Sequence, residues 1–194
     1  MKRVRVTGWV VACLFAAAMA GGVSSAYGSD YRVDPEHSFV EFRVQHLGFS
    51  WLYGRFNTVS GEFTYDPAQP AKSTIAVTIE TGSVDTRHAE RDKHLRSKDF
   101  LHVKKFPVAL FKSSSFTGDA EGGVMEGLLT LHGVSKPVSI TVKKIGEGKD
   151  PWKGYRAGFV GSVTLNRRDF AIDYDLGPKG DLLEFDLSIE GIRQ

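Results

Sequence analysis

Apolar and polar residues alternate along most of the chain, and this period of two constrains the fold more than any other feature. From residue 38 onward, Val40, Phe42 and Val44 fall on one face while the residues between them are polar, as a half-buried strand requires. The same pattern recurs in seven further segments, at residues 59–65, 75–79, 108–110, 125–131, 138–142, 155–165 and 183–189. The sequence therefore predicts eight strands.

Turn-forming segments separate these strands, among them "YDPAQP", "TGDAEGG", "HGVSKP", "GEGKDPWKG" and "DLGPKGD". Most of them are short enough for consecutive strands to be antiparallel neighbours. Eight antiparallel strands in up-and-down order leave no exposed edge if the sheet closes on itself. We therefore expect an all-β fold, an eight-stranded antiparallel barrel.

The first 28 residues have a composition of their own. Three basic residues within the first five precede an apolar run from Val10 to Ala20, and small residues follow. We expect a secretory signal peptide at residues 1–28, cleaved after Ala26 or Gly28, and one domain at residues 29–194. The single cysteine, Cys13, lies in this segment, so the mature domain is expected to contain no disulfide.

Net charge and hydropathy exclude two classes of protein. Removal of the three basic residues with the signal peptide changes the formal net charge from +2 to −1, so no nucleic-acid partner is expected. The apolar stretch from Thr7 to Val23 is slightly too short for a transmembrane helix. We therefore expect a chain that is not an integral membrane protein.

The longest connection runs from Asp85 to Pro107, between the third and fourth strands, and contains the charged segment "RDKHLRSKDF". Its first half predicts a helix capped by Asp85 or Thr86. Only Ala89 and Leu95 are apolar within this helix, so it has little to bury and should lie across the barrel. Long insertions of this kind are often lids over a binding site.

Four interpretations of this charged segment compete. The first is a catalytic site, and the second is a metal site built from His88 and His94 with Asp92 or Asp85. The third is a cationic rim that binds the polar head group of a ligand. The fourth is a set of charges that pair with one another. On a helix the two histidines would point about 240° apart, and the chain has no HExxH or CxxC motif. It also lacks GxSxG and SxxK motifs. We therefore predict no catalytic residue, no metal and no cofactor, and the last two interpretations stay open.

Several blocks of the sequence together resemble the YceI family: "HLGFSWLYGRF" (46–56), "SVDTRHAERDKHLRSKDF" (83–100), "FP" with "FKSSSF" (106–116), "LLTLHGVSKPVSI" (128–140), "DPWKGYRAGF" (150–159), "RRDFAI" (167–172) and "IEG" (189–191). They span nearly the whole mature chain in order, and they are most similar to the Gram-negative periplasmic branch. The resemblance implies a lipocalin-like barrel with a helix beside it and a periplasmic location. It also implies a lumen for a long polyisoprenoid chain, such as that of a quinone or a prenyl phosphate.

These observations lead to one functional hypothesis and two alternatives. The hypothesis is a periplasmic carrier or storage protein for a long-chain isoprenoid lipid, without enzymatic activity. The alternatives are an enzyme acting on a prenyl-type substrate through His94, Asp92 and Arg91, and a stress-related structural or interaction protein with a filled lumen. Transient membrane contact and a homodimer stay open.

Candidate ligand-binding residues follow from the strand faces and from the charged segment. The inward faces place the following residues in the lumen: Val40, Phe42, Val44, Phe63, Ile75, Val77, Leu110, Leu129, Ile140, Phe159 and Phe185. The expected rim consists of His46, Trp51, Arg91, His94 and Arg96. The cluster Arg167, Arg168 and Asp169 is expected to be a solvated loop that pairs internally.

Overall fold

The computed structural model describes residues 28–177 and 179–194. The predicted signal peptide, apart from Gly28, and the cleavage site after Ala26 lie outside these residues. Among the described helices, none has the length and apolarity needed to cross a bilayer.

Eleven strands and four short helices make up the described fold. The strands are β1 (Ser29–Val33), β2 (Phe39–His46), β3 (Ser50–Phe56), β4 (Val59–Tyr65), β5 (Thr74–Glu80), β6 (Val84–Asp85), β7 (Val108–Gly118), β8 (Gly122–Leu131), β9 (Val134–Lys149), β10 (Tyr155–Asn166) and β11 (Leu182–Arg193). The α-helix is α1 (Ala89–Leu95), and the 3₁₀ turns are η1 (Pro70–Lys72), η2 (Thr81–Ser83) and η3 (Arg167–Phe170).

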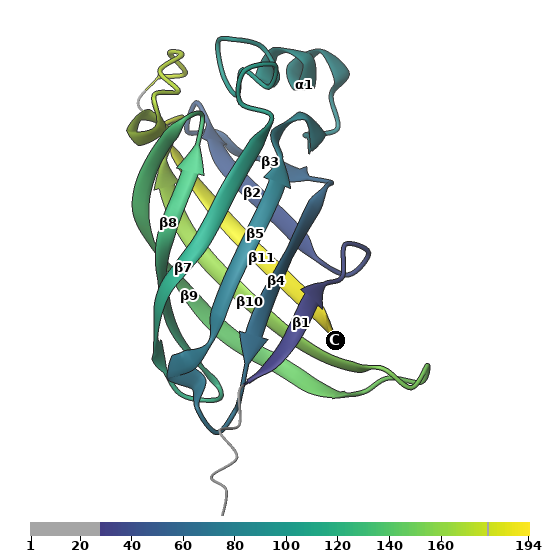
Figure 1. Cartoon of the computed structure of the whole chain (residues 1–194). Coiled ribbons are helices and arrows are strands. Elements are labelled where there is room, and N and C mark those ends of the chain that lie inside the picture. Colours follow the sequence, from purple (N-terminus) through teal and green to yellow (C-terminus); the bar gives the residue numbers. More distant parts are fainter. Residues whose placement is uncertain (1–27, 178) are drawn as a thin grey trace, which may run out of the picture.

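The strands close into an antiparallel barrel of eight walls (Figure 1). Two walls consist of two strands each. The first is formed by β1 and β2, which both pair with β11. The second is formed by β4, which pairs with β1, and β3, which pairs with β2. The other walls are β5, β7, β8, β9, β10 and β11, and the pairing of β1 with β11 closes the ring. The predicted eight-stranded barrel, with one helical insertion between its third and fourth strands, is confirmed.

Buried side chains fill only part of the barrel interior. One cluster, with Tyr31, Phe63 and Tyr65, lies beneath β1, and a second, with Phe42 and Phe100, lies beneath the insertion. A third, smaller cluster on β2, β4 and β5 lies along the wall that joins them. Several inward-facing side chains of β8, β9 and β10 belong to none of these clusters: Leu129, Ile140, Val142, Val163 and Leu165. The core is therefore one-sided, and this wall faces open space.

Glycines on the inner faces accommodate aromatic rings from neighbouring strands. A Cβ atom at Gly54 would lie 2.4 Å from Cζ of Phe42, and one at Gly127 would lie 2.4 Å from Cζ of Phe111. Each ring therefore rests against the backbone of the adjacent strand, a close approach that only glycine allows. This packing keeps the rings at the wall of the barrel.

The charged insertion is anchored at the end of the barrel by a few buried contacts. Phe100 and Leu101 are buried against the barrel, and Leu95 packs on the same cluster. The predicted helix cap is wrong: His88 caps α1, its Nδ1 accepting a hydrogen bond from the Arg91 backbone at 3.2 Å. A histidine takes this role because the Thr86 backbone and hydroxyl already donate to the Asp92 carboxylate, and Asp85 caps the turn at residue 87.

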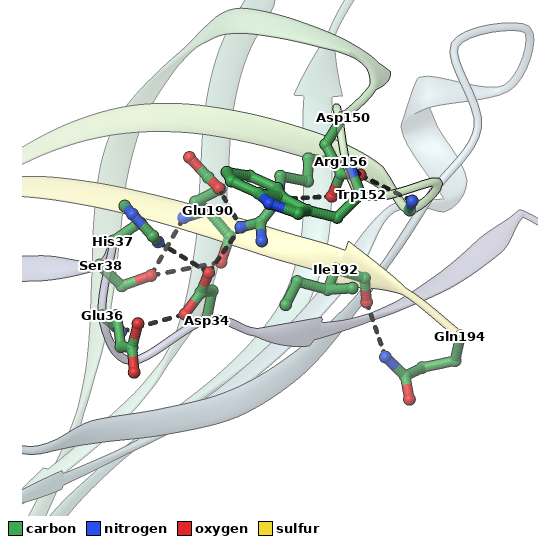
Figure 2. A network of polar contacts seen from close by, with 11 residues as sticks. Asp34, Glu36, His37, Ser38, Asp150, Trp152, Arg156, Glu190, Ile192 and Gln194 are labelled. Atoms are coloured by element: carbon green, nitrogen blue, oxygen red, sulfur yellow. Dashed lines mark hydrogen bonds and ion pairs between the residues drawn. The ribbon is translucent and has the colours of Figure 1, made fainter.

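One arginine joins the segments that meet where the barrel closes (Figure 2). Nη1 of Arg156, on β10, lies 2.5 Å from carboxylate oxygens of both Asp34 and Glu190, and its Nε donates to Asp150 at 2.9 Å. Burial alone would raise the pKa of Asp34, but hydrogen bonds from Arg156 and His37 outweigh it and lower the pKa to about 2. The network ties the end of β1, the start of the β9–β10 hairpin and β11 together.

Candidate ligand-binding lumen

An apolar cavity of about 890 Å³ occupies the interior of the barrel. This volume lies toward the upper end of the range usual for small-molecule pockets, roughly 300–1,000 Å³. Its wall is built almost entirely from aliphatic and aromatic side chains on the inner faces of the strands. The cavity disagrees with the alternative of a filled lumen, and its walls offer a long ligand apolar contact along its length.

Ten of the eleven residues predicted to face the lumen line this cavity. They are Val40, Phe42, Val44, Phe63, Ile75, Val77, Leu129, Ile140, Phe159 and Phe185. That each of them contacts a ligand stays a prediction.

The prediction that Leu110 faces the lumen is wrong. Its side chain lies on the outer face and is 44% exposed, whereas Ala109 and Phe111 are buried and line the cavity. The pairing of β5 with β7 sets this phase, because Val77, which faces inward, lies opposite Phe111. Only two apolar residues after Pro107 supported the opposite phase, and so short a pattern does not fix it.

The end of the cavity nearest α1 is framed by an aromatic group. The ring of His94 lies edge-on to Phe100 and Tyr174, with ring centroids 4.9 and 5.0 Å apart, and Phe100 and Tyr174 are themselves 4.8 Å apart. All three residues line the cavity, as does His46 at the end of β2. Nε2 of His94 lies 3.3 Å from a carboxylate oxygen of Asp99, on the outer side. His94 thus joins an apolar rim to a polar exterior.

Arg91 brings a positive charge to the same end. Its Nε donates to the Thr86 hydroxyl at 2.7 Å, and its Nη2 donates to the Thr86 carbonyl at 2.6 Å. Neither contact uses Nη1, and Arg91 lines the cavity. The guanidinium is therefore held in place by one edge while its remaining N–H groups can donate to an oxygen of a ligand.

Two of the predicted rim residues, Trp51 and Arg96, do not line the cavity, so their assignment as ligand-binding residues is wrong. Trp51 lies on the outer face of β3, because its neighbours Ser50 and Leu52 are the residues that face inward. The Cζ atom of Arg43 lies 4.6 Å from the centroid of the Trp51 ring. Arg96 donates to the backbone carbonyls of residues 82 and 84 at 2.7 and 2.5 Å, and thereby fastens the insertion to the barrel.

Arg167 is a cavity-lining residue that the sequence analysis assigned to a solvated loop. It is only 5% exposed, and its side chain donates to the Gly180 and Ile172 carbonyls and to the Asp181 carboxylate, at 2.9, 2.5 and 2.7 Å. Burial lowers the pKa of this guanidinium. Arg168, in contrast, is exposed as expected, but it pairs with Asp181 and not within the cluster. The signal was present in the sequence, because the inward phase of β10 at residues 163 and 165 continues to 167.

One cluster among the described residues has the donor types of a metal site, but an arginine lies within it. Ligand atoms of Asp34, His37 and Glu190 lie within 4.8 Å of one another. The Arg156 guanidinium bridges the two carboxylates and supplies the positive charge there. The other set considered from the sequence is used differently, since His88 caps α1, His94 faces Asp99, and Asp92 accepts from Thr86.

Comparison with known proteins agrees with this architecture. A family model described as the YceI-like domain matches residues 31–191. A UPF0312 protein of Pseudomonas aeruginosa is 56% identical over 171 residues, which cover 87% of this chain and 90% of that protein. A UPF0312 protein of Yersinia enterocolitica is 53% identical, with 87% of this chain and 89% of that protein covered.

Solved structures share the fold. The YceI protein of Campylobacter jejuni superimposes with a TM-score of 0.69 at 29% identity, covering 78% of this chain and 90% of that one. BcnA of Burkholderia cenocepacia gives a TM-score of 0.72 at 22% identity, covering 81% and 98%. A domain of Saccharophagus degradans, described as polyisoprenoid-binding and implicated in plant cell wall breakdown, gives 0.64 at 16% identity, covering 84% and 98%.

Proposed function

The chain belongs to the YceI family, and from that premise we propose that it holds one long-chain isoprenoid lipid in its lumen, as a periplasmic carrier or storage protein. The observation that carries the proposal is the apolar cavity, which reaches the surface near α1 between exposed residues that also line it. The family is one of ligand-binding barrels. In our proposal the lipid therefore leaves the lumen chemically unchanged.

The energetics of such a cavity favour a long apolar chain. Each methylene group moved from water into the lumen contributes about 0.8 kcal/mol, so a five-carbon isoprene unit contributes roughly 4 kcal/mol if fully buried. Affinity therefore grows with the number of units that fit, and few polar contacts are needed. The S. degradans domain is described as binding a polyisoprenoid. Isoprenoids are for this reason the first lipid class to test here.

We place the polar head of the ligand at the α1 end of the lumen. Arg91 supplies N–H donors and a positive charge there, and His94 and Tyr174 frame the opening. At the opposite end the cavity wall is neutral or acidic, with Thr74 and Asp119 among its residues. An anionic head such as a phosphate is therefore accommodated better beside α1.

Competition binding tests this proposal. The protein, stripped of lipid, is loaded with an apolar fluorescent dye, and a prenyl phosphate or the prenyl alcohol of equal length is titrated in. Both lipids should displace the dye from the unchanged protein. The variant Arg91→Gln should bind the phosphate at least tenfold more weakly, because a charge-assisted hydrogen bond contributes about 1.5–3 kcal/mol, while its affinity for the alcohol changes little.

Arg87→Gln is the matched control, because Arg87 lies in the same segment but is exposed and does not line the cavity. It should behave like the unchanged protein. Failure of both lipids to displace the dye would contradict the proposed function. Equal weakening of both lipids by Arg91→Gln would instead mean that this arginine only supports the insertion.

A further inference from the structure

Exposed apolar side chains gather around one end of the barrel. We call this set the mouth patch, and it comprises Leu47, Phe49, Tyr174, Leu176 and Leu182, which are 61%, 87%, 43%, 37% and 55% exposed. Two segments contribute to it: the β2–β3 turn and the segment from η3 into β11. Both lie at the end of the barrel that carries α1 (Figure 1).

The two segments form one surface that is continuous with the lumen. Strands β2 and β11 are paired, with Val44 opposite Leu183, and a Cβ atom at Gly48 would lie 3.9 Å from Cγ of Lys179. Three members of the mouth patch, Leu47, Tyr174 and Leu176, also line the cavity. An apolar chain that enters or leaves at this end therefore passes directly over the mouth patch.

The conformation of the β2–β3 turn gives no structural reason for an apolar residue at its tip. Leu47 and Gly48 both have left-handed φ values, 53° and 81°, and the turn is closed by a 2.9 Å hydrogen bond from the Phe49 N–H to the His46 carbonyl. Two successive residues with positive φ favour Asn and Gly. Leu47 adopts this unfavourable conformation while being mostly exposed, and the ring of the neighbouring Phe49 is almost fully in solvent. A role at an interface explains both residues.

Charge and aromatic character indicate which partner fits this surface. Residues 86–105, beside the mouth, contain seven Lys and Arg residues against three Asp and Glu. Asp173 and Asp175, close to the patch, only partly offset this excess. On the outer face of β3, Trp51 and Tyr53 flank the patch and are exposed. Apolar tips, flanking amphipathic rings and a basic surround are typical of proteins that bind an anionic bilayer surface.

We propose that the mouth patch docks the α1 end of the barrel onto an anionic phospholipid bilayer, so that the lumen opens toward the membrane. The inference rests on the proposed function, because a bilayer is the reservoir from which a water-insoluble lipid would be taken up. Phe49 and Leu182 insert into the interfacial region of the bilayer, and the basic residues of the insertion face the phosphate groups of its lipids.

Vesicle sedimentation tests the docking. The protein is mixed with vesicles of phosphatidylcholine alone or with one quarter phosphatidylglycerol, and the bound fraction is measured at low and high salt. The unchanged protein should bind the mixed vesicles, and added salt should weaken binding. The double variant Phe49→Ser/Leu182→Ser should bind them at least tenfold more weakly. The matched control is Val124→Ser/Ile145→Ser, which removes two exposed apolar residues near the β7–β8 turn, at the opposite end of the barrel, and should leave vesicle binding unchanged.

Dye competition by a prenyl alcohol, on the same proteins, separates docking from lipid binding. Neither Phe49 nor Leu182 lines the cavity, so both double variants should keep the affinity of the unchanged protein. Absence of vesicle binding by the unchanged protein would overturn the docking and leave the lumen proposal intact. Equal vesicle binding by both double variants would also overturn it. Docking without any prenyl alcohol binding would sink the proposed function alone.

Discussion

The double variant Leu129→Trp/Ile140→Trp is expected to lose at least 100-fold in affinity for a long prenyl lipid. Both side chains line the cavity, and neither belongs to a buried cluster, so the added indole rings occupy the space of the ligand. Displacing a single isoprene unit from the lumen costs roughly 4 kcal/mol, which exceeds the 2.8 kcal/mol or so that corresponds to 100-fold. Isothermal titration with the lipid-free protein measures this loss.

The matched control for this lumen block changes the neighbouring outward-facing residues. Leu128→Trp/Thr141→Trp adds the same two rings to the same two strands, at positions on the outer face. Its affinity should stay within a factor of three of the unchanged protein, by the rule that small exposed changes contribute about 0.5 kcal/mol or less. Both double variants should have a Tm within a few degrees of that of the unchanged protein. If the lumen-facing pair kept full affinity while folding normally, the ligand would not lie in the lumen.

The variant Arg156→Met is expected to lower the free energy of unfolding by about 3 kcal/mol. Removal of the guanidinium leaves Asp34, Asp150 and Glu190 without their shared cation at the closure of the barrel, and Asp34 is almost fully buried. For a domain of this size that loss corresponds to a fall in Tm of roughly 6–12 °C. Urea unfolding and thermal melting measure it.

Arg43→Met is the matched control, because the pair formed by Arg43 and Glu184 is more than one third exposed on both sides. Its loss should cost no more than about 1 kcal/mol. Equal destabilisation by the two variants would contradict the special role of Arg156.

Acid unfolding provides a second measure of the Arg156 network. Since the pKa of Asp34 is lowered to about 2, the stability that its carboxylate contributes is complete above about pH 4 and is lost as the pH falls toward 2. The unchanged protein and Arg43→Met should both show this acid loss. In Arg156→Met the loss of stability between about pH 4 and pH 2 should be smaller. Without the hydrogen bond from Arg156, burial raises the pKa of Asp34 back toward its ordinary value.

The alternation of apolar and polar residues predicted most of the strands correctly. The prediction failed where the alternating run was short or where a wall was made of two strands. Long runs such as the one around Phe159 gave the correct inward face. At Leu110 two apolar residues were too few to set the phase, which depends on the pairing with β5. Strands β2 and β4 were predicted but β1 and β3 were missed, because each of the first two walls is made of two short strands; β1 is held by the distant strand β11 and β3 by its hairpin partner β2.

The rim was harder to predict because charged side chains in loops have no period to reveal their direction. Arg91 and Arg96 lie on the same insertion, yet one lines the cavity and the other binds backbone carbonyls. Tyr174 contacts His94 from a segment 80 residues away, a contact that no local pattern indicates. Arg167 is the exception, because it continues the inward-facing alternation of Val163 and Leu165 and could have been predicted to face the lumen.

Native mass spectrometry of the protein purified from a Gram-negative host, followed by solvent extraction, tests most directly whether the lumen holds a lipid. We expect one long-chain isoprenoid per barrel, released intact by the solvent and missing from Leu129→Trp/Ile140→Trp. A barrel that is reproducibly empty, and that takes up no prenyl lipid when one is supplied, would contradict this expectation.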